Sequence, residues 1–446
     1  MSNKTRLQLS RHTLGSAIII FLFTIATVVM TYIAAYNVEL VPVVAVAFVS
    51  ITLAAMNKLV ALVSCMVLAG FVQAPVAGIL QLSSILWVDD VFLLGSVLAI
   101  LYRIFLYRRW RILLFSVLCV LVLAIGVARA ATVDSGVYQA RQVMVPLVLI
   151  MLGALLRENE LRKITRFIFP LGLITSIYVV FEIMGFHLID PWLAMKFNDL
   201  KNVANYAFSR ELPLNYYYFY GNASNLYFER AGGLFLNPPG VGLFVAGIGL
   251  LAKGFGTKHQ QRLAPFMTAA TVIGSVGRAS AVVFLLGLGQ ATVVKKLTRV
   301  GLVLIATAAA ALLLSFFSDQ GNSSAHASGF VDGLTSAVTN PLGLGFGRVG
   351  NTADQAAESF GESLLGMFVA SLGWPALAAL VFAAFHALRR ADQIQNIALT
   401  AAILTSALSE TLSGLAFAAP LWILAGNAWA LEAKKIPNQS QASTIA

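Results

Sequence analysis

Long apolar runs, separated by short polar breaks, occupy almost the whole chain. A run of about 20 apolar residues can cross the hydrocarbon core of a bilayer as a helix. We therefore predict an all-α polytopic membrane protein with roughly fourteen transmembrane helices, forming one integral membrane domain over residues 1–446. The predicted spans are 14–36, 40–56, 59–82, 91–107, 112–131, 143–156, 167–186, 240–252, 263–275, 279–294, 300–317, 362–386, 396–414 and 417–431.

The composition supports this prediction and changes how the net charge is interpreted. Of the 446 residues, 59% are hydrophobic and 11% are charged, whereas soluble domains carry about 25% charged residues. A net charge of +11 would suggest nucleic-acid binding in a soluble protein, but in a membrane protein basic residues mark the cytoplasmic loops. We expect no nucleic-acid partner. Cys65 and Cys119 lie within apolar runs and fit neither a disulfide framework nor a metal site.

The polar breaks alternate in charge when the N-terminus is placed inside the cell. The breaks on the cytoplasmic side then hold 22 of the 30 Lys and Arg residues, whereas 15 of the 19 Asp and Glu residues lie on the other side. The basic N-terminal segment leads into a long apolar run, which predicts a retained signal anchor. We expect a bacterial inner-membrane protein with both termini cytoplasmic, a cytoplasmic tail at 432–446, and two larger periplasmic loops at 187–239 and 318–361.

Eight basic residues lie on the outward side, where this charge rule predicts few. They are Arg129, Arg141, Lys196, Lys201, Arg210, Arg230, Arg278 and Arg348. Arg141, Arg230 and Arg278 lie at the outer edges of predicted spans, where a charge is costly unless it is paired or faces a water-filled cavity. Guanidinium groups present a planar fork to phosphate oxygens, so the pattern favours an anionic ligand.

Aromatic and amide side chains accompany these arginines in the loop 187–239. They are Tyr216, Tyr217, Tyr218, Tyr220, Asn222 and Asn225. Flat rings suit the apolar faces of sugars and amides suit the hydroxyls, so we expect a polyprenyl-diphosphate-linked saccharide. The predicted reaction is glycosyl transfer, in which arginine stabilises the departing diphosphate and Glu362 takes the proton of the acceptor hydroxyl. No Asp-x-Asp pair with metal-ligand spacing occurs in an outward loop, so neither a metal nor a cofactor is expected.

Four segments within 225–385 resemble, in order and spacing, the motifs of the O-antigen polymerase and O-antigen ligase superfamily. They are ERAGGLFLNPPGVGLF, GSVGRASAVVFLLGLG, NPLGLGFGRVG and ESFGESLLGMFVASLGWPAL. The resemblance implies a C-type glycosyltransferase-like fold and a reaction that inverts the sugar on a lipid diphosphate. The candidate diphosphate ligands are Arg230, Arg278, Arg141 and Arg348. The candidate substrate-binding residues are Arg210, Tyr220 and Asn237.

Two departures from the family pattern bear on function. Gly277 stands where the second motif usually has Ser before its Arg. Glu362 and Ser363 stand where the ligases have a His-Asn pair, which favours a polymerase. Glu358, one helical turn earlier, competes with Glu362 as the catalytic base. The resemblance also implies a flippase and a chain-length regulator as partners, besides membrane lipids.

Simpler alternatives exist for most of these residues. Arg230 and Arg278 could be interfacial residues that touch only lipid headgroups, Arg210 could pair locally with Glu211, and the tyrosines could form an interfacial aromatic belt. Glu182 and Glu410, inside apolar runs, fit helix packing. The Gly-x-Gly-x-Gly sequence at 343–347 follows no strand, so it predicts a turn. Three functional alternatives stay open. They are an O-antigen ligase, a transporter or flippase of a lipid-linked saccharide, and a cell-wall glycosyltransferase of the shape-elongation-division-sporulation type, whose acidic loop pattern is not evident here. A transporter would place its polar residues at the bilayer midplane.

Overall fold

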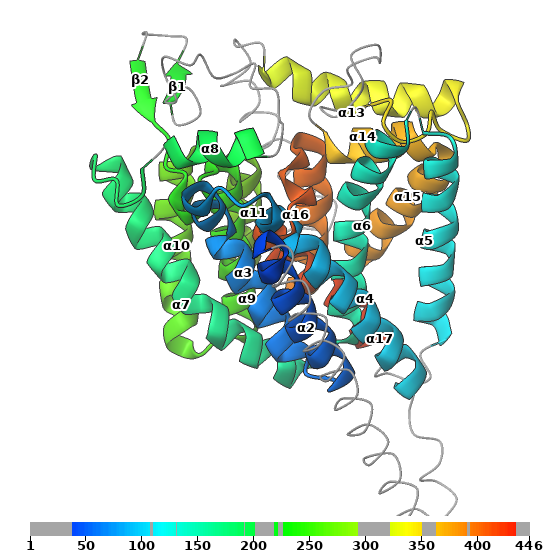
Figure 1. The fold of residues 1–446 in the computed structure, drawn as a ribbon, viewed down its shortest axis with the longest axis horizontal. Coiled ribbons are helices and arrows are strands. Elements are labelled where there is room, and N and C mark those ends of the chain that lie inside the picture. Colours follow the sequence, from blue (N-terminus) through cyan, green and yellow to red (C-terminus); the bar gives the residue numbers. More distant parts are fainter. Residues whose placement is uncertain are drawn as a thin grey trace, which may run out of the picture.

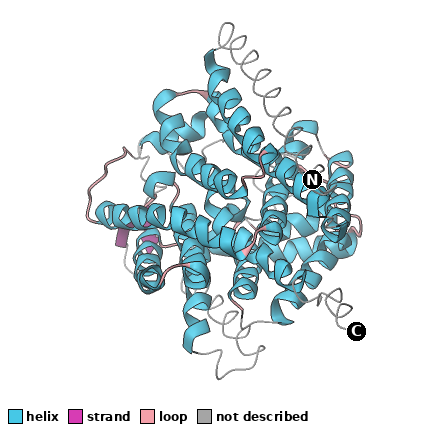
Figure 2. Ribbon diagram, turned by 90° about the horizontal axis from the view of Figure 1, so that it is seen from below, coloured by secondary structure: helices cyan, strands magenta, loops and turns pink. Residues whose placement is uncertain are grey.

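The computed structural model of the protein describes residues 38–107, 110–130, 132–190, 192–200, 218–221, 226–292, 322–349, 363–389 and 393–433. This part of the chain is almost entirely helical (Figures 1 and 2). Within it, five helices are long and apolar enough to cross a membrane, so the protein is a helical membrane protein. They are α3 (Leu59–Leu80), α4 (Val88–Tyr107) with the preceding 3-10 helix η2 (Ser83–Trp87), α6 (Val133–Leu155), α7 (Glu158–Ile183) and α9 (Pro238–Phe255).

Shorter helices complete the bundle. The shorter apolar helices are α2 (Val41–Ala55), which follows the 3-10 helix η1 (Val38–Leu40), α5 (Trp110–Ala128), α11 (Arg278–Thr292), α15 (Trp374–Arg389), α16 (Ile394–Leu408) and α17 (Leu415–Ala433). Between α9 and α11 lies α10 (Lys258–Ser275), and α14 (Leu364–Leu372) precedes α15. The expected spans 14–36 and 300–317 lie outside the described residues.

The long helices run between the two ends of the bundle, whereas α8 (Trp192–Leu200) and α13 (Asn322–Thr339) lie across one end (Figure 1). We call the end that carries α8, the hairpin of β1 (Tyr218–Gly221) with β2 (Leu226–Glu229), and α13 the upper end. The opposite end is the lower end. The expected loops 187–239 and 318–361 therefore contain regular structure, and α9 already begins at Pro238.

The centre of the bundle is built on α9, which packs against α7, α10, α11 and α17. Nearly all of its residues are buried. Helix α17 approaches α6 closely because small residues face it: a Cβ added at Gly153 would lie 2.1 Å from the Ile423 carbonyl oxygen, and one at Gly426 would lie 2.1 Å from the Ile150 carbonyl oxygen. Such contacts through small residues are the usual way in which helices associate in membranes.

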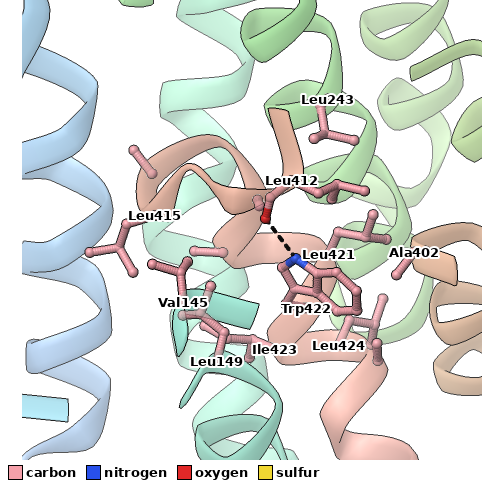
Figure 3. Packing of buried hydrophobic residues seen from close by; sticks show 14 of the residues in the cluster. Val145, Leu149, Leu243, Ala402, Leu412, Leu415, Leu421, Trp422, Ile423 and Leu424 are labelled. Carbon is pink, nitrogen blue, oxygen red and sulfur yellow. Dashed lines mark hydrogen bonds between the residues drawn. The ribbon is translucent and has the colours of Figure 1, made fainter. Parts of the chain in front are cut away.

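An indole lies in this core without losing its hydrogen bond. Trp422 of α17 is 5% exposed, and its Nε1 donates to the Leu412 carbonyl oxygen over 3.0 Å (Figure 3). Leu412 belongs to the 3-10 helix η5 (Glu410–Ser413), which follows α16. The predicted span 396–414 thus ends as a helix at Leu408, and the turn that replaces its last residues supplies the carbonyl that the buried indole needs.

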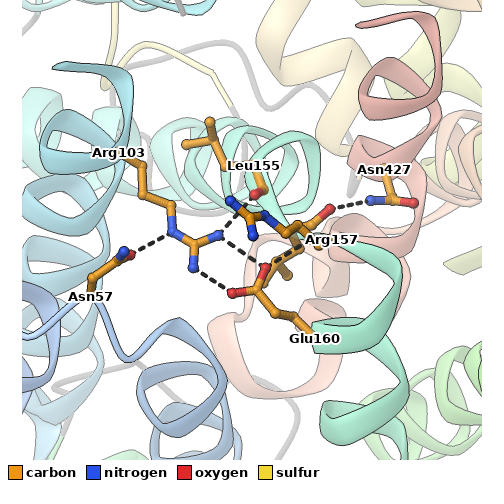
Figure 4. A network of polar contacts seen from close by, with 7 residues as sticks. Asn57, Arg103, Leu155, Arg157, Glu160 and Asn427 are labelled. Atoms are coloured by element: carbon orange, nitrogen blue, oxygen red, sulfur yellow. Dashed lines mark hydrogen bonds and ion pairs between the residues drawn. The ribbon is translucent and has the colours of Figure 1, made fainter. Parts of the chain in front are cut away.

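A polar network closes the lower end (Figure 4). The Arg103 side chain of α4 is 3% exposed and forms an ion pair with Glu160 of α7. It also donates to Asn57 Oδ1 over 2.7 Å and to the Leu155 carbonyl oxygen over 2.9 Å. From α17, Asn427 Nδ2 donates to the Leu156 carbonyl oxygen over 2.9 Å. The network therefore joins the α2–α3 turn, α4, α6, α7 and α17. The Glu160 carboxylate balances the charge of the Arg103 guanidinium.

Two further helices differ from the predicted spans in an instructive way. Helix α7 begins at Glu158, not at 167, because the polar sequence forms a capping box in which Glu160 accepts from the Arg157 N–H over 2.8 Å. The run 362–386 is two helices, α14 and α15, because Gly373 between them has φ +66° and ψ −142°. A hydropathy pattern does not show such a break, since the residues on both sides are equally apolar.

Candidate functional site

The segment 229–240 forms a compact turn that leads from the hairpin into α9. Gly233 has φ +60° and Leu236 has φ +51°, both left-handed conformations. The Asn237 side chain accepts from the Gly240 N–H over 2.8 Å, and Pro238 is the first residue of the helix. Asn237 and Pro238 thus form a helix start of standard chemistry. The structure accordingly gives Asn237, a predicted substrate-binding residue, a capping role.

Phe235 anchors this turn in the core. Its side chain is 3% exposed, and its ring lies 4.8 Å from that of Phe244, 5.5 Å from that of Phe71 and 5.5 Å from that of Phe417, measured between centroids. All three contacts are edge-to-face, the arrangement that aromatic quadrupoles favour. The turn that carries Arg230 is therefore held by rings from α3, α9 and α17.

Arg230 lies against the turn between α10 and α11. Its Nε donates to the Ser275 carbonyl oxygen over 3.1 Å, and the N–H of the next residue, Ala231, donates to the Gly274 carbonyl oxygen over 2.9 Å. Arg278 begins α11 three residues after Ser275. The structure thus brings the two arginine-bearing motifs together at the upper end, although 48 positions separate them in the sequence. We refer to Arg230, Ser275 and Arg278 as the arginine site.

The position before Arg278 has no room for a side chain. A Cβ added at Gly277 would lie 2.4 Å from Ser280 Oγ and 3.2 Å from Ser275 Oγ. Both serines are buried, and Ser280 Oγ donates to the Gly277 carbonyl oxygen over 2.7 Å. Two neighbouring hydroxyls therefore fill the space around the position where the resembling family usually has Ser.

Helix α7 holds both ends of the segment between it and α9. Glu182 is 2% exposed and accepts from the Gly233 N–H over 2.8 Å. Tyr178, one helical turn earlier, lies beside Glu182 and its hydroxyl accepts from the Ile189 N–H over 3.0 Å. The sequence suggested helix packing for Glu182, with a relay role as the alternative. Its position at the end of an apolar run, just before the long polar loop, was the available signal for this second role.

Arg141, a predicted diphosphate ligand, lies in α6 and forms ion pairs within the bundle. Its guanidinium pairs with Asp90 and lies 4.0 Å from an Asp89 carboxylate oxygen, both in the first turn of α4. The Arg141 side chain is 32% exposed. Two carboxylates neutralise this guanidinium, so its position is explained by structure, and its contribution to an anion site would require these pairs to open.

Arg348 follows the glycine-rich turn, and its side chain is exposed. Gly343, Gly345 and Gly347 have φ of +75°, +91° and +77°, which confirms the prediction of a turn at 343–347. The Gly345 N–H donates to the Ser371 carbonyl oxygen over 3.0 Å. This hydrogen bond holds the turn against the C-terminal end of α14.

The same turn is fastened to α5 and α6. Phe346 is fully buried, and its N–H donates to the Gly126 carbonyl oxygen over 3.0 Å. Gln139 of α6, also fully buried, accepts from the Gly347 N–H and donates to the Val349 carbonyl oxygen over 2.9 Å. Gln139 precedes Arg141 by two residues, so the two side chains leave α6 in different directions: Gln139 contacts the turn before Arg348, whereas Arg141 contacts α4.

Other predicted site residues cannot be placed against this geometry. Glu358, Glu362 and Arg210 lie outside the described residues. Tyr220 belongs to β1, where its backbone pairs with that of Tyr227 in the antiparallel hairpin. Within the described part of the chain, no group of three His, Cys, Asp or Glu side chains could hold a metal ion.

Chemically, the arginine site suits an anion. The Arg230 side chain lies against the turn before α11, and Arg278 is the first residue of α11, a helix whose N-terminus carries a partial positive charge. Comparison of the chain with protein-family models, curated proteins and solved structures finds no match.

Proposed function

We propose that the protein is a polysaccharide polymerase that joins oligosaccharide repeat units carried on undecaprenyl diphosphate. The observation that carries this proposal is the hydrogen bond from Arg230 to the Ser275 carbonyl, which brings two distant motifs into one arginine site next to the start of α11. An undecaprenyl-linked donor presents a diphosphate at the membrane surface, and this arrangement of guanidiniums and helix terminus is suited to hold it.

The distribution of charge supports the orientation that the reaction needs. Lys58, Arg157 and Lys258 lie in or beside lower-end turns, whereas Asp89 and Asp134 begin helices at the upper end. By the charge rule the lower end is cytoplasmic and the upper end periplasmic. We infer an inner-membrane protein of about fourteen spans, with both termini cytoplasmic and a C-type glycosyltransferase-like fold.

In the proposed reaction, the growing chain on undecaprenyl diphosphate is the donor. A hydroxyl of the incoming repeat unit attacks the anomeric carbon, the bond from this carbon to the diphosphate oxygen breaks, and the sugar is inverted. The hydroxyl proton passes to Glu362, or to Glu358 in its place. The departing diphosphate gains negative charge, which Arg230 and Arg278 stabilise. No metal or cofactor takes part in this scheme.

The test compares surface polysaccharide in a deletion strain that carries the wild-type protein, Arg230→Ala, Arg278→Ala or Arg278→Lys. The control is Arg162→Ala, because Arg162 is 55% exposed and pairs, among the described residues, with Glu158 one turn away. Membrane levels of every variant are measured. We expect single repeat units to persist while long chains disappear in both alanine variants, and the Arg162→Ala strain to match the wild type.

Other outcomes identify other functions. Long chains that form but stay on the carrier lipid would show a ligase. Repeat units that accumulate on the cytoplasmic face would show a flippase. Normal chain lengths in both alanine variants at normal protein levels would refute the role of the arginine site.

A further inference from the structure

A small cavity lies between α9, α10 and α11, away from the arginine site. Its volume is about 70 Å³, which is room for a few water molecules or one phosphate-sized group. It is lined by Ala246, Gly249, Leu250, Lys253, Gln261 and Thr268, among others. Lys253 lies in the last turn of α9 and Gln261 in the first turns of α10, so the cavity extends from the lower end into the bundle.

Lys253 is the unusual residue of this cavity. Its side chain is only partly exposed, and its Nζ donates to the Gly287 carbonyl oxygen of α11. Among the described residues, no carboxylate lies within ion-pair distance of it. An ammonium group near the edge of a membrane normally extends into water or pairs with an acid. Here the Lys253 side chain lies beside the cavity, so an anion bound in the cavity would pair with its ammonium group.

The lining changes from polar to apolar along the cavity. Lys253 and Gln261 occupy its lower part, whereas Ala246 and Val283 lie deeper. On α9 the distance from Lys253 to Ala246 corresponds to about 10 Å along the helix axis. An amphiphile with a charged head and an apolar tail matches this gradient, whereas a free ion matches only the lower part.

The cavity adjoins the lipid-facing side of α10. Pro265 lines it, and the next residue, Phe266, is 76% exposed. Farther along the same helix, Ile273 is 73% exposed. Large apolar side chains exposed on a membrane protein contact acyl chains, so a lipid at this surface has its headgroup within reach of the cavity.

We propose that the cavity between α9, α10 and α11 binds the headgroup of an anionic phospholipid, whose phosphate contacts Lys253 and Gln261. Basic pockets between helices near a membrane surface recognise lipid phosphates through such contacts. The acyl chains lie along the exposed face of α10. This binding site is independent of the polymerase function.

The test measures lipid binding to the full-length purified protein by native mass spectrometry. The probes are dioctanoyl phosphatidylglycerol, dioctanoyl phosphatidylcholine and inorganic phosphate. The variants are Lys253→Met and Gln261→Glu, with Lys258→Met as the control, because Lys258 is an exposed lysine in the first turn of α10. Gln261 is exposed and its Nε2 donates to the Gly256 carbonyl oxygen over 3.2 Å, so Gln261→Glu removes this exposed hydrogen bond but leaves the core intact.

We expect the protein to retain phosphatidylglycerol in preference to phosphatidylcholine. Binding weakens by at least about 10-fold in Lys253→Met and in Gln261→Glu, as for the loss of a charge-assisted hydrogen bond, and stays unchanged in Lys258→Met. Three results would each overturn the proposal. The first is equal binding of the two lipids, and the second is an equal loss of phosphatidylglycerol binding in Lys253→Met and Lys258→Met. The third is competition by inorganic phosphate at the same concentration as phosphatidylglycerol. If Lys253→Met does not fold, the proposal is tested by Gln261→Glu and by the comparison of phosphatidylglycerol with phosphatidylcholine binding.

Discussion

Glu182 allows the geometry of the arginine site to be tested without any assay of activity. The substitution Glu182→Ala removes the acceptor of the Gly233 N–H, which lies in a buried turn. Leaving a buried N–H without a partner costs about 1–3 kcal/mol. The substitution destabilises the closed conformation of the segment 230–237 by this amount. The equilibrium population of the open conformation therefore increases by about 5–150 times.

Hydrogen exchange measured by mass spectrometry on the purified protein follows this opening. We expect faster exchange in peptides that cover 230–237 and unchanged exchange in α5, which packs against α4, α6 and α14. Global stability is the wrong readout, because removing a buried carboxylate also removes its desolvation cost. Glu182→Gln keeps an acceptor oxygen and should give a smaller effect.

The control for this experiment is Glu158→Ala. The Glu158 side chain is 51% exposed and pairs with Arg162 one turn away, so its loss should leave exchange at 230–237 unchanged. Unaltered exchange of this segment in Glu182→Ala would refute the reasoning. An equal increase over the whole chain would refute it too, since the argument requires a local release.

Three further predictions concern stability. Glu160→Ala leaves the Arg103 guanidinium, whose side chain is 3% exposed, without its carboxylate, and should lower the free energy of unfolding by about 3–5 kcal/mol. Gly345→Ala should destabilise by more than about 1 kcal/mol, because φ is +91° there and the added Cβ would lie 2.2 Å from the Arg129 carbonyl oxygen. Phe235→Ala removes a ring that is 3% exposed and should cost about 3–5 kcal/mol. Thermal or denaturant unfolding in detergent measures all three.

Each of these substitutions has a matched control in the same chain. Arg162→Ala removes half of an exposed pair and should change stability by less than about 1 kcal/mol. Gly185→Ala shares the left-handed backbone, with φ +83°, but its added Cβ would meet nothing within 4 Å. Phe266→Ala removes a ring that is 76% exposed. A control that destabilised the protein as much as its partner would contradict the assigned cause.

Sequence patterns were sufficient for features that depend on local composition. The apolar runs predicted a helical membrane protein, and the run 59–82 matches α3 closely. The spacing of glycines at 343–347 predicted a turn, which is confirmed by three positive φ angles. These predictions succeed because transfer into a bilayer depends on side-chain polarity, and because only glycine adopts a left-handed backbone at low cost.

The limits of the sequence were set by contacts between distant segments. Hydropathy placed Arg141 and Arg230 alike at outer span edges, yet Arg141 pairs with two carboxylates of α4, while Arg230 lies on the turn before α11. Asn237 was predicted as a sugar ligand from its chemistry, and only the structure shows that its side chain also caps α9. Which partner a polar group meets depends on the packing of the whole bundle, which no single segment encodes.

The sequence by itself thus determined that this protein is helical and built for a membrane, and it singled out the arginines as unusual. Only the tertiary structure showed that the Arg230 side chain lies against the turn before α11, that Glu182 holds the turn at Gly233, and that Lys253 lines a cavity. The reason is physical. Polarity is a property of each residue, whereas hydrogen bonds, ion pairs and cavities are properties of residues brought together by folding.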